Sequence, residues 1–192
     1  MTERTVPELV EAFASGDNRA FTELVGRYQK NVYSVAFQVV GNHLDADEVV
    51  QETFVRIYNR REELRAVQYF TSFVMRVATN YAIDLLRKRK GQDSLTTSTD
   101  DLPERVQLDL ASRVSTPERD YRSQKIMAEI MQALDRLPPR QKLTAILHDV
   151  EGYTKSEIAE MMKCPEATVR SNLHIARTKL KKILEHRLVT KE

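Results

Sequence analysis

The feature that most constrains this chain is a pair of short helical segments near its C-terminus, separated by a turn. Thr154 and Glu157 have the spacing of a capping box, in which two polar side chains satisfy free backbone groups at the start of a helix. The sequence Lys163-Cys164-Pro165 follows, and it predicts a tight turn because proline cannot continue a helix. A helix, a tight turn and a second helix form the skeleton of a helix-turn-helix.

The second helix of this pair has one apolar and one polar face. Val169, Leu173, Ala176, Leu180 and Ile183 recur at intervals of three and four residues, which predicts that they point into a core. The opposite stripe combines cations, a hydroxyl and an imidazole, which can contact base edges and phosphates when a helix lies in the DNA major groove. The residues of that stripe are Ala167, Arg170, Ser171, His174 and Arg177.

Composition excludes several classes of protein. A chain of 192 residues with five Gly, no Trp and 30% charged residues is typical of a mostly helical protein of one medium domain or two small ones. One cysteine excludes an intrachain disulfide and a cysteine-cluster metal site, and we expect no catalytic residues, metal or cofactor. The net charge of +2 means that any DNA affinity must come from local basic patches.

The sequence also predicts where the protein resides. Its longest apolar runs fall short of the roughly 18 residues that a transmembrane helix needs. The N-terminus lacks the apolar core of a signal peptide. We therefore expect a cytoplasmic protein that does not insert into a membrane.

Helix start and stop signals recur along the whole chain and predict an all-α fold of two small helical domains. In the first domain, residues 1–90, we expect four helices. They run from the capping box of Thr5 and Glu8 to Ala14, from Asp17 to about 40, from Asp45 to about 57, and over 68–88. Residues 91–119 are rich in Ser, Thr and acidic side chains and predict a flexible acidic linker, although composition alone equally favours a solvated spacer with no further task. Residues 120–192 form the second domain, which contains the helix-turn-helix.

The helix that begins near Asp45 carries a candidate protein-binding face. Glu48, Gln51 and Glu52 lie opposite its apolar side, and an acidic face with an amide can bind a basic partner helix. Acidic residues in a first helical turn also complement the helix dipole, and the residues alone favour that simpler interpretation.

The helix over 68–88 carries candidate nucleic-acid contacts. The segment from Arg65 to Tyr69, before this helix, could frame a pocket for an unstacked base, which costs a few kcal/mol to extrude. Phe70 and Phe73 fall on the apolar stripe, so we expect them in the core. Arg65 precedes the helix, and the polar side chains expected on its exposed side are Arg76, Thr79, Asn80, Arg87, Lys88 and Arg89.

These motifs together resemble the extracytoplasmic-function (group 4, ECF) sigma factors of the sigma-70 family. Residues 45–54 resemble the polymerase-binding helix of that family and residues 70–87 its promoter-melting helix. Residues 137–141 and 168–171 match its fourth conserved region, which adds Thr168 to the DNA-facing residues. The resemblance covers about residues 16–184.

The resemblance implies an alternative sigma factor with core RNA polymerase, promoter DNA and an anti-sigma factor as partners. It assigns polymerase binding to Glu48, Gln51 and Glu52. It assigns recognition and melting of the −10 element to Arg65, Arg76, Asn80, Arg87 and Lys88. It assigns recognition of the −35 element to Thr168, Arg170, Ser171, His174 and Arg177.

The chain departs from the family pattern at four positions. Phe73 stands where the family usually has Trp, and Glu48 where it has Asp, so the aromatic group and the charge are kept. Asn172 and Ile175 stand where it usually has Arg. We therefore expect the second domain alone to bind DNA feebly, with useful affinity only when polymerase tethers both domains to one promoter.

Two other classes of function are alternatives to this one. A conventional helix-turn-helix regulator would explain the second domain but leaves the first without a role. An enzyme would need a catalytic motif, and the sequence contains no phosphate-binding Gly-rich loop, no His-x-x-x-His pair and no nucleophile elbow.

Overall fold

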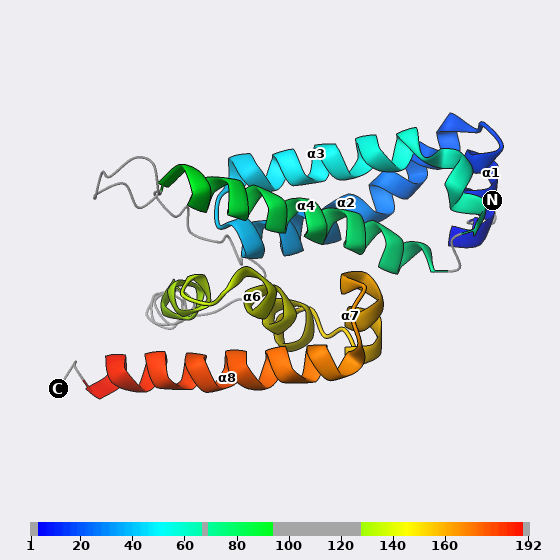
Figure 1. The fold of residues 1–192 in the computed structure, drawn as a ribbon. Coiled ribbons are helices and arrows are strands. Elements are labelled where there is room, and N and C mark those ends of the chain that lie inside the picture. The colour runs from blue at the N-terminus through cyan, green and yellow to red at the C-terminus, as the bar shows by residue number, and fades with distance from the viewer. Residues whose placement is uncertain (1–3, 67–68, 94–127, 190–192) are drawn as a thin grey trace, which may run out of the picture.

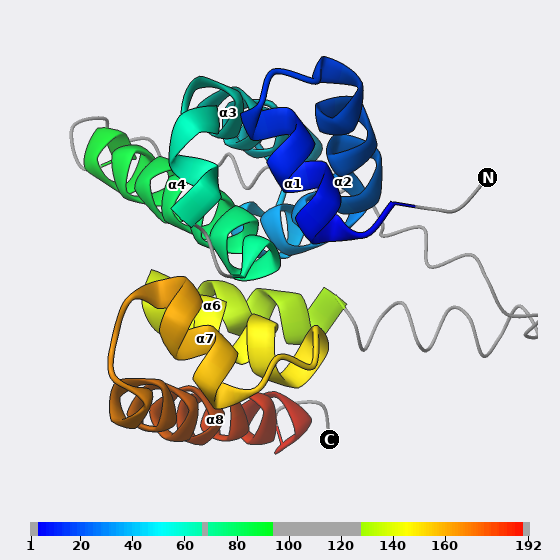
Figure 2. The same cartoon turned by 90° about the vertical axis from the view of Figure 1, so that its right-hand side faces the viewer.

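The computed structural model describes residues 4–66, 69–93 and 128–189, which form two stacked layers of helices (Figures 1 and 2). The all-α prediction of two small helical domains is confirmed, since these ranges contain helices and no strand. The N-terminal layer contains α1 (Val6–Ala14), α2 (Asn18–Val40), α3 (His43–Asn59), the 3-10 helix η1 (Arg61–Ala66) and α4 (Phe70–Asp93). The C-terminal layer contains a helix over 128–135, α6 (Pro139–Ala145), the π-helical η2 (Ile146–Val150), α7 (Lys155–Met162) and α8 (Glu166–Val189).

The expected local signals set several helix boundaries. At the start of α1 the Glu8 carboxylate accepts a hydrogen bond from the Thr5 backbone N–H at 2.7 Å. At the start of α7 the Glu157 carboxylate accepts from the Thr154 N–H at 2.8 Å, and the Thr154 hydroxyl accepts from the Glu157 N–H at 3.3 Å. Gly41, with φ of 85°, ends α2 in the left-handed conformation that glycine adopts without steric cost.

Two boundaries differ from the expected ones. Helix α3 begins at His43 rather than Asp45, because the Asn42 side chain accepts a hydrogen bond from the Asp45 N–H at 2.9 Å and so caps the helix earlier. Helix α4 continues to Asp93, past the expected end at Lys88 and into the predicted linker. The rest of the linker predicted over 91–119 lies outside the described residues.

A departure from regular α-helix lies between Pro139 and Val150, where the chain forms α6 followed by the π-helical turn η2. The Glu151 N–H donates to the carbonyl of Ile146 at 3.0 Å and closes that wider turn. A π-turn inserts a residue relative to α-helical spacing, which the apolar pattern alone could not reveal.

The two layers share one continuous apolar core. Leu24, Ile57 and Val74 are among the fully buried side chains of the N-terminal layer, and Leu143 and Ile158 are among those of the C-terminal layer. Helix α7 packs beside α4, and α6 and η2 contact α2 (Figure 1). The two domains are therefore in direct contact, whereas the sequence suggested two separate surfaces joined by a linker. Within the described ranges, no helix is both long and apolar enough to span a membrane.

Candidate nucleic-acid interface

The helix-turn-helix is formed by α7 and α8. Lys163, with φ of 47°, takes the left-handed conformation at the end of α7, and the Cys164 N–H donates to the carbonyl of Ala159 at 3.0 Å. The apolar side of α8 is buried as predicted at Val169, Leu173 and Ala176. Leu180 and Ile183 are only half-buried.

The predicted DNA-facing stripe of α8 is open to solvent, and α8 itself lies on the side of the C-terminal layer away from the N-terminal layer (Figure 1). Arg170, Ser171, His174 and Arg177 are exposed, and Thr168 is half-buried at the edge of the stripe. The structure therefore brings these side chains together on one helix face. An exposed stripe of this kind can enter a major groove.

Both arginines of this stripe have carboxylate partners. The Arg170 guanidinium donates to Glu166, four residues earlier, at 2.9 Å. The Arg177 guanidinium donates to both oxygens of Asp149, at 2.5 and 3.2 Å, and the hydrogen bond with Asp149 raises the pKa of Arg177. Exposed ion pairs contribute little to stability, so a phosphate or a guanine could replace either carboxylate at small cost.

The exposed stripe of α4 carries a second set of polar side chains. Asn80, Arg87 and Lys88 are exposed, and Arg87 pairs with Asp84 at 3.5 Å. Arg76 is half-buried, and its guanidinium lies 5.1 Å from the centre of the Phe73 ring. A cation over an aromatic face is held by the ring quadrupole, so Phe73 positions Arg76 at the surface.

Two residues expected on this stripe are not on it. Thr79 is 1% exposed, because α4 is covered on more than one side by neighbouring helices. Arg89 forms an ion pair with the buried carboxylate of Asp45, so it joins α4 to the first turn of α3. Phe70 and Phe73 are buried as predicted.

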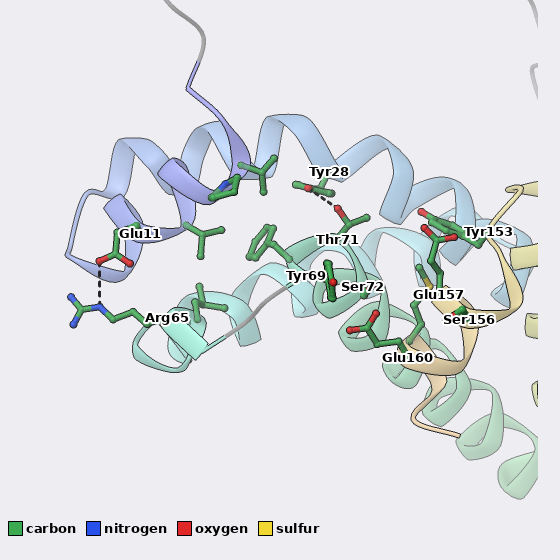
Figure 3. A pocket seen from close by; sticks show the side chains of 16 residues that line it. Glu11, Tyr28, Arg65, Tyr69, Thr71, Ser72, Tyr153, Ser156, Glu157 and Glu160 are labelled. Atoms are coloured by element: carbon green, nitrogen blue, oxygen red, sulfur yellow. Dashed lines mark hydrogen bonds and ion pairs between the residues drawn. The ribbon is translucent and has the colours of Figure 1, made fainter. Parts of the chain in front are cut away.

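A cavity of about 760 Å³ lies next to the predicted base pocket (Figure 3). Arg65, Tyr69 and Phe70 line it from the N-terminal layer, and Arg65 donates to the Ser15 hydroxyl at 3.2 Å. The opposite wall includes Glu157 and Glu160 of α7. Sequence reasoning missed these carboxylates at the site, because they lie some ninety residues away along the chain and carry no local signal.

The candidate protein-binding face of α3 lies at the surface. Glu48 and Gln51 are exposed and Glu52 is half-buried. The Tyr81 hydroxyl of α4 donates to Glu48 at 2.5 Å, and this hydrogen bond raises the pKa of Tyr81 to about 12. Arg56 pairs with Glu52 at 2.7 Å and lies over the Tyr81 ring at 4.7 Å.

This face also presents apolar groups. Leu44 is 78% exposed and Val55 is 52% exposed. With Glu48 and Gln51 they follow the spacing of one helical stripe on α3. Leu44 and Val55 were not among the predicted site residues, although their spacing relative to the two polar residues was a usable signal in the sequence.

Comparisons with known proteins identify the family of this chain. Residues 24–92 match the family model "Sigma-70 region 2", and residues 127–180 match "Sigma-70, region 4". The RNA polymerase sigma-H factor of Pseudomonas aeruginosa is 32% identical over 96% of this chain and 96% of its own. The ECF RNA polymerase sigma-E factor of Haemophilus influenzae is 32% identical over 88% of this chain and 89% of its own.

A solved structure has the same fold. The sigma factor RpoE of Bartonella quintana, in complex with the anti-sigma factor NepR, matches with a TM-score of 0.64 and 18% identity, over 86% of this chain and 96% of that one. The two family models and the curated relatives define a transcription initiation factor of the sigma-70 type. The chain belongs to the ECF RNA polymerase sigma factors of the sigma-70 family.

Proposed function

We propose that this chain is an alternative sigma factor that binds core RNA polymerase, directs it to specific promoters and assists promoter opening. The observation that carries the proposal is that one chain of this family presents two nucleic-acid-type surfaces on separate helices, the stripes of α4 and α8. Such a factor acts in the cytoplasm as a non-catalytic subunit of the polymerase.

The polymerase contact is the α3 face that contains Glu48, Gln51 and Glu52. These side chains are exposed or half-buried, and the flanking Leu44 and Val55 supply apolar area. An interface with an apolar centre and charged groups around it gives both affinity and orientation. A basic helix of the polymerase with apolar side chains would suit this face.

The −10 element is assigned to α4 and the segment before it. Asn80, Arg76, Arg87 and Lys88 contact the DNA backbone along the α4 stripe. Arg65 lies at the cavity that would receive an unstacked base. Tyr69 is 57% exposed at the same cavity, and its ring offers a stacking surface.

The −35 element is assigned to α8. Arg170 suits base readout, since an arginine that donates two hydrogen bonds to guanine is the commonest specific contact. Arg177 suits a phosphate, with Ser171, His174 and Thr168 completing the face. Asn172 and Ile175 supply no cation, so polymerase must tether the domain for useful affinity.

An anti-sigma factor is the proposed regulatory partner. The support is the fold shared with a sigma factor that was solved in complex with an anti-sigma factor. No residue of this chain is assigned to that contact.

Run-off transcription with purified core polymerase and fragmented genomic DNA tests the function. We expect discrete transcripts only when the chain is added. The alternative, a conventional helix-turn-helix regulator, predicts tight binding to a palindromic site without polymerase and no transcripts that depend on the chain.

A further inference from the structure

One exposed side chain beside the DNA-facing residues of α8 is apolar. Ile175 is 36% exposed, and Ser171 and Thr178 are exposed as well. These three residues follow one another at intervals of four and three, so they form a single file along the helix. Ile175 therefore shares the exposed face of α8 with Ser171, which is assigned to the −35 element.

Packing within the chain does not explain an isoleucine at this position. In the part of the chain that the structure describes, Ile175 belongs neither to the apolar core nor to the partly buried side chains packed against it, whereas its neighbour Ala176 is fully buried. Helix propensity does not explain it either, because isoleucine loses rotamer freedom in a helix and forms helices less well than lysine or arginine. The side chain is thus available for a contact outside the chain.

Thr178 extends this apolar surface. Its hydroxyl donates to the carbonyl of His174 at 2.8 Å, four residues earlier in the same helix. Because the helix backbone engages the hydroxyl, the methyl group is what this exposed side chain offers to an outside partner. Ile175 and Thr178 lie three residues apart and are neighbours on the helix surface. We call them the apolar pair; both are β-branched, so little rotamer freedom is lost when a partner binds.

Cations flank the apolar pair on both sides of the helix. Arg177 and Lys179 are exposed, and at 100° per residue they fall on opposite edges of the face that holds the pair. Arg177 pairs with Asp149, and Lys179 donates to the Gln141 side chain at 3.2 Å. Contacts from such cations to phosphates hold a recognition helix in register with the duplex. In that position the apolar pair faces the base edges in the groove.

The base that suits such a pair is thymine. In the major groove its C5-methyl group distinguishes thymine from the other three bases, and the side chains that contact this group are apolar or carry a methyl group. Ile175 lies five residues after Arg170, about 7.5 Å along the axis at a rise of 1.5 Å per residue. At 3.4 Å per base pair, this distance spans about two steps of the duplex.

We propose that Ile175 and the methyl group of Thr178 read a thymine of the −35 element through its C5-methyl group, about two base pairs from the guanine contacted by Arg170. Arg170 selects one base by hydrogen bonds, and the apolar pair selects another by methyl contact. This inference rests on the proposed function, because it takes the exposed face of α8 as the −35 surface.

The test removes only the methyl group from the DNA. Deoxyuridine pairs with adenine as thymine does but lacks the C5-methyl group. It replaces each thymine of the −35 element in turn, on either strand of a promoter found by run-off transcription. We expect holoenzyme to bind about fourfold more weakly when one particular thymine is replaced, as measured by competition fluorescence anisotropy; fourfold corresponds to about 0.8 kcal/mol. Replacement of the other thymines should change binding little.

Two variants of the full chain remove the partners of that methyl group. Ile175→Ala should bind the thymine promoter about fourfold more weakly than wild type and should no longer distinguish thymine from deoxyuridine at the sensitive position. Thr178→Ser keeps the hydroxyl that donates to His174 and removes only the methyl group, so it should reduce the same thymine-to-deoxyuridine ratio.

A matched control lies on the same helix. Lys179→Ala removes a flanking cation and should weaken binding to the thymine and deoxyuridine promoters alike, because phosphate contacts carry no sequence information. The ratio between the two DNAs should therefore stay at the wild-type value. Circular dichroism checks that each variant keeps its helix content.

Three results would overturn the inference while leaving the proposed function intact. The first is a wild-type holoenzyme that transcribes from the promoter but is insensitive to loss of every thymine methyl group in the −35 element. The second is an Ile175→Ala variant that still distinguishes thymine from deoxyuridine as wild type does. The third is an unchanged ratio in Thr178→Ser, which would exclude the apolar pair. If wild type supports no transcription with core polymerase, the proposed function fails, and the inference fails with it.

Discussion

Tyr81 of α4 donates a hydrogen bond to the Glu48 carboxylate of α3, with the two oxygens 2.5 Å apart. The phenol therefore orients a side chain of the proposed polymerase-binding face from the helix proposed to open the promoter. Because ionising Tyr81 would break this bond and place two negative charges together, the pKa of Tyr81 rises from 10.0 to about 12. At neutral pH the contact is intact.

Reversing charge on the α3 face should weaken polymerase binding. We expect Glu48→Lys combined with Gln51→Lys to raise the Kd for core polymerase about tenfold at physiological salt, because complementary charges are replaced by repulsive ones. Fluorescence anisotropy with labelled protein measures it. Glu62→Lys with Glu63→Lys adds comparable positive charge at exposed positions of η1 and should bind normally. Near-wild-type binding by the α3 variant would exclude this face.

Removing polar groups from the α4 stripe should slow promoter opening more than initial binding. We expect Asn80→Ala with Arg87→Ala to reduce permanganate reactivity of the −10 region, since strand separation costs several kcal/mol and these side chains hold the opened strand. A pre-melted template should restore transcription. Asp84→Ala, on the same stripe, removes an anion and should not slow opening. The assignment is wrong if opening is unchanged or the bubble does not rescue the defect.

Arg170→Ala should relax sequence preference at the −35 element. An arginine with two hydrogen bonds to guanine discriminates by about 1–3 kcal/mol, so the loss should be confined to one base position. Holoenzyme binding to promoters with single-base changes measures this profile. Equal weakening on all these promoters would instead make Arg170 a phosphate contact.

Asp149→Asn should strengthen DNA binding through Arg177. Asp149 contacts the Arg177 guanidinium at 2.5 Å, and the substitution removes the negative charge from this contact. The guanidinium is then more available to bind a phosphate. Arg177→Ala should weaken binding to all sequences alike and lower the salt dependence by about one unit of slope. Salt titrations of holoenzyme on one promoter compare the two variants, and identical slopes would contradict the phosphate assignment.

The Glu157 capping box should make α7 sensitive to acid. Hydrogen bonds from the Thr154 backbone and hydroxyl hold the pKa of Glu157 below its ordinary value of 4.5. Its contribution to stability is therefore present above that value and is lost as pH falls through the lowered pKa. Thermal unfolding of Glu157→Gln should show a weaker acid dependence, since glutamine can close the box without a charge. An unchanged acid dependence would rule out this role.

Much of the fold could be predicted from the chain alone. Capping boxes, prolines and apolar spacing act within a few residues, so the helix-turn-helix and the exposed stripe with Arg170 and His174 followed from local rules. Errors arose where distant contacts compete with those rules. Thr79 is buried by neighbouring helices, and Arg89 forms an ion pair with the buried carboxylate of Asp45.

By itself, the sequence determined the helices, the faces they present and the family to which the chain belongs. Only the tertiary structure decided how the two helical layers meet. Gln38 and Glu151 lie 113 residues apart, and neither carries a local sign that one would hydrogen-bond the other. The physical reason is that helix formation is governed by short-range propensity and periodicity, whereas the contact between domains depends on the shape and charge that whole surfaces acquire after folding.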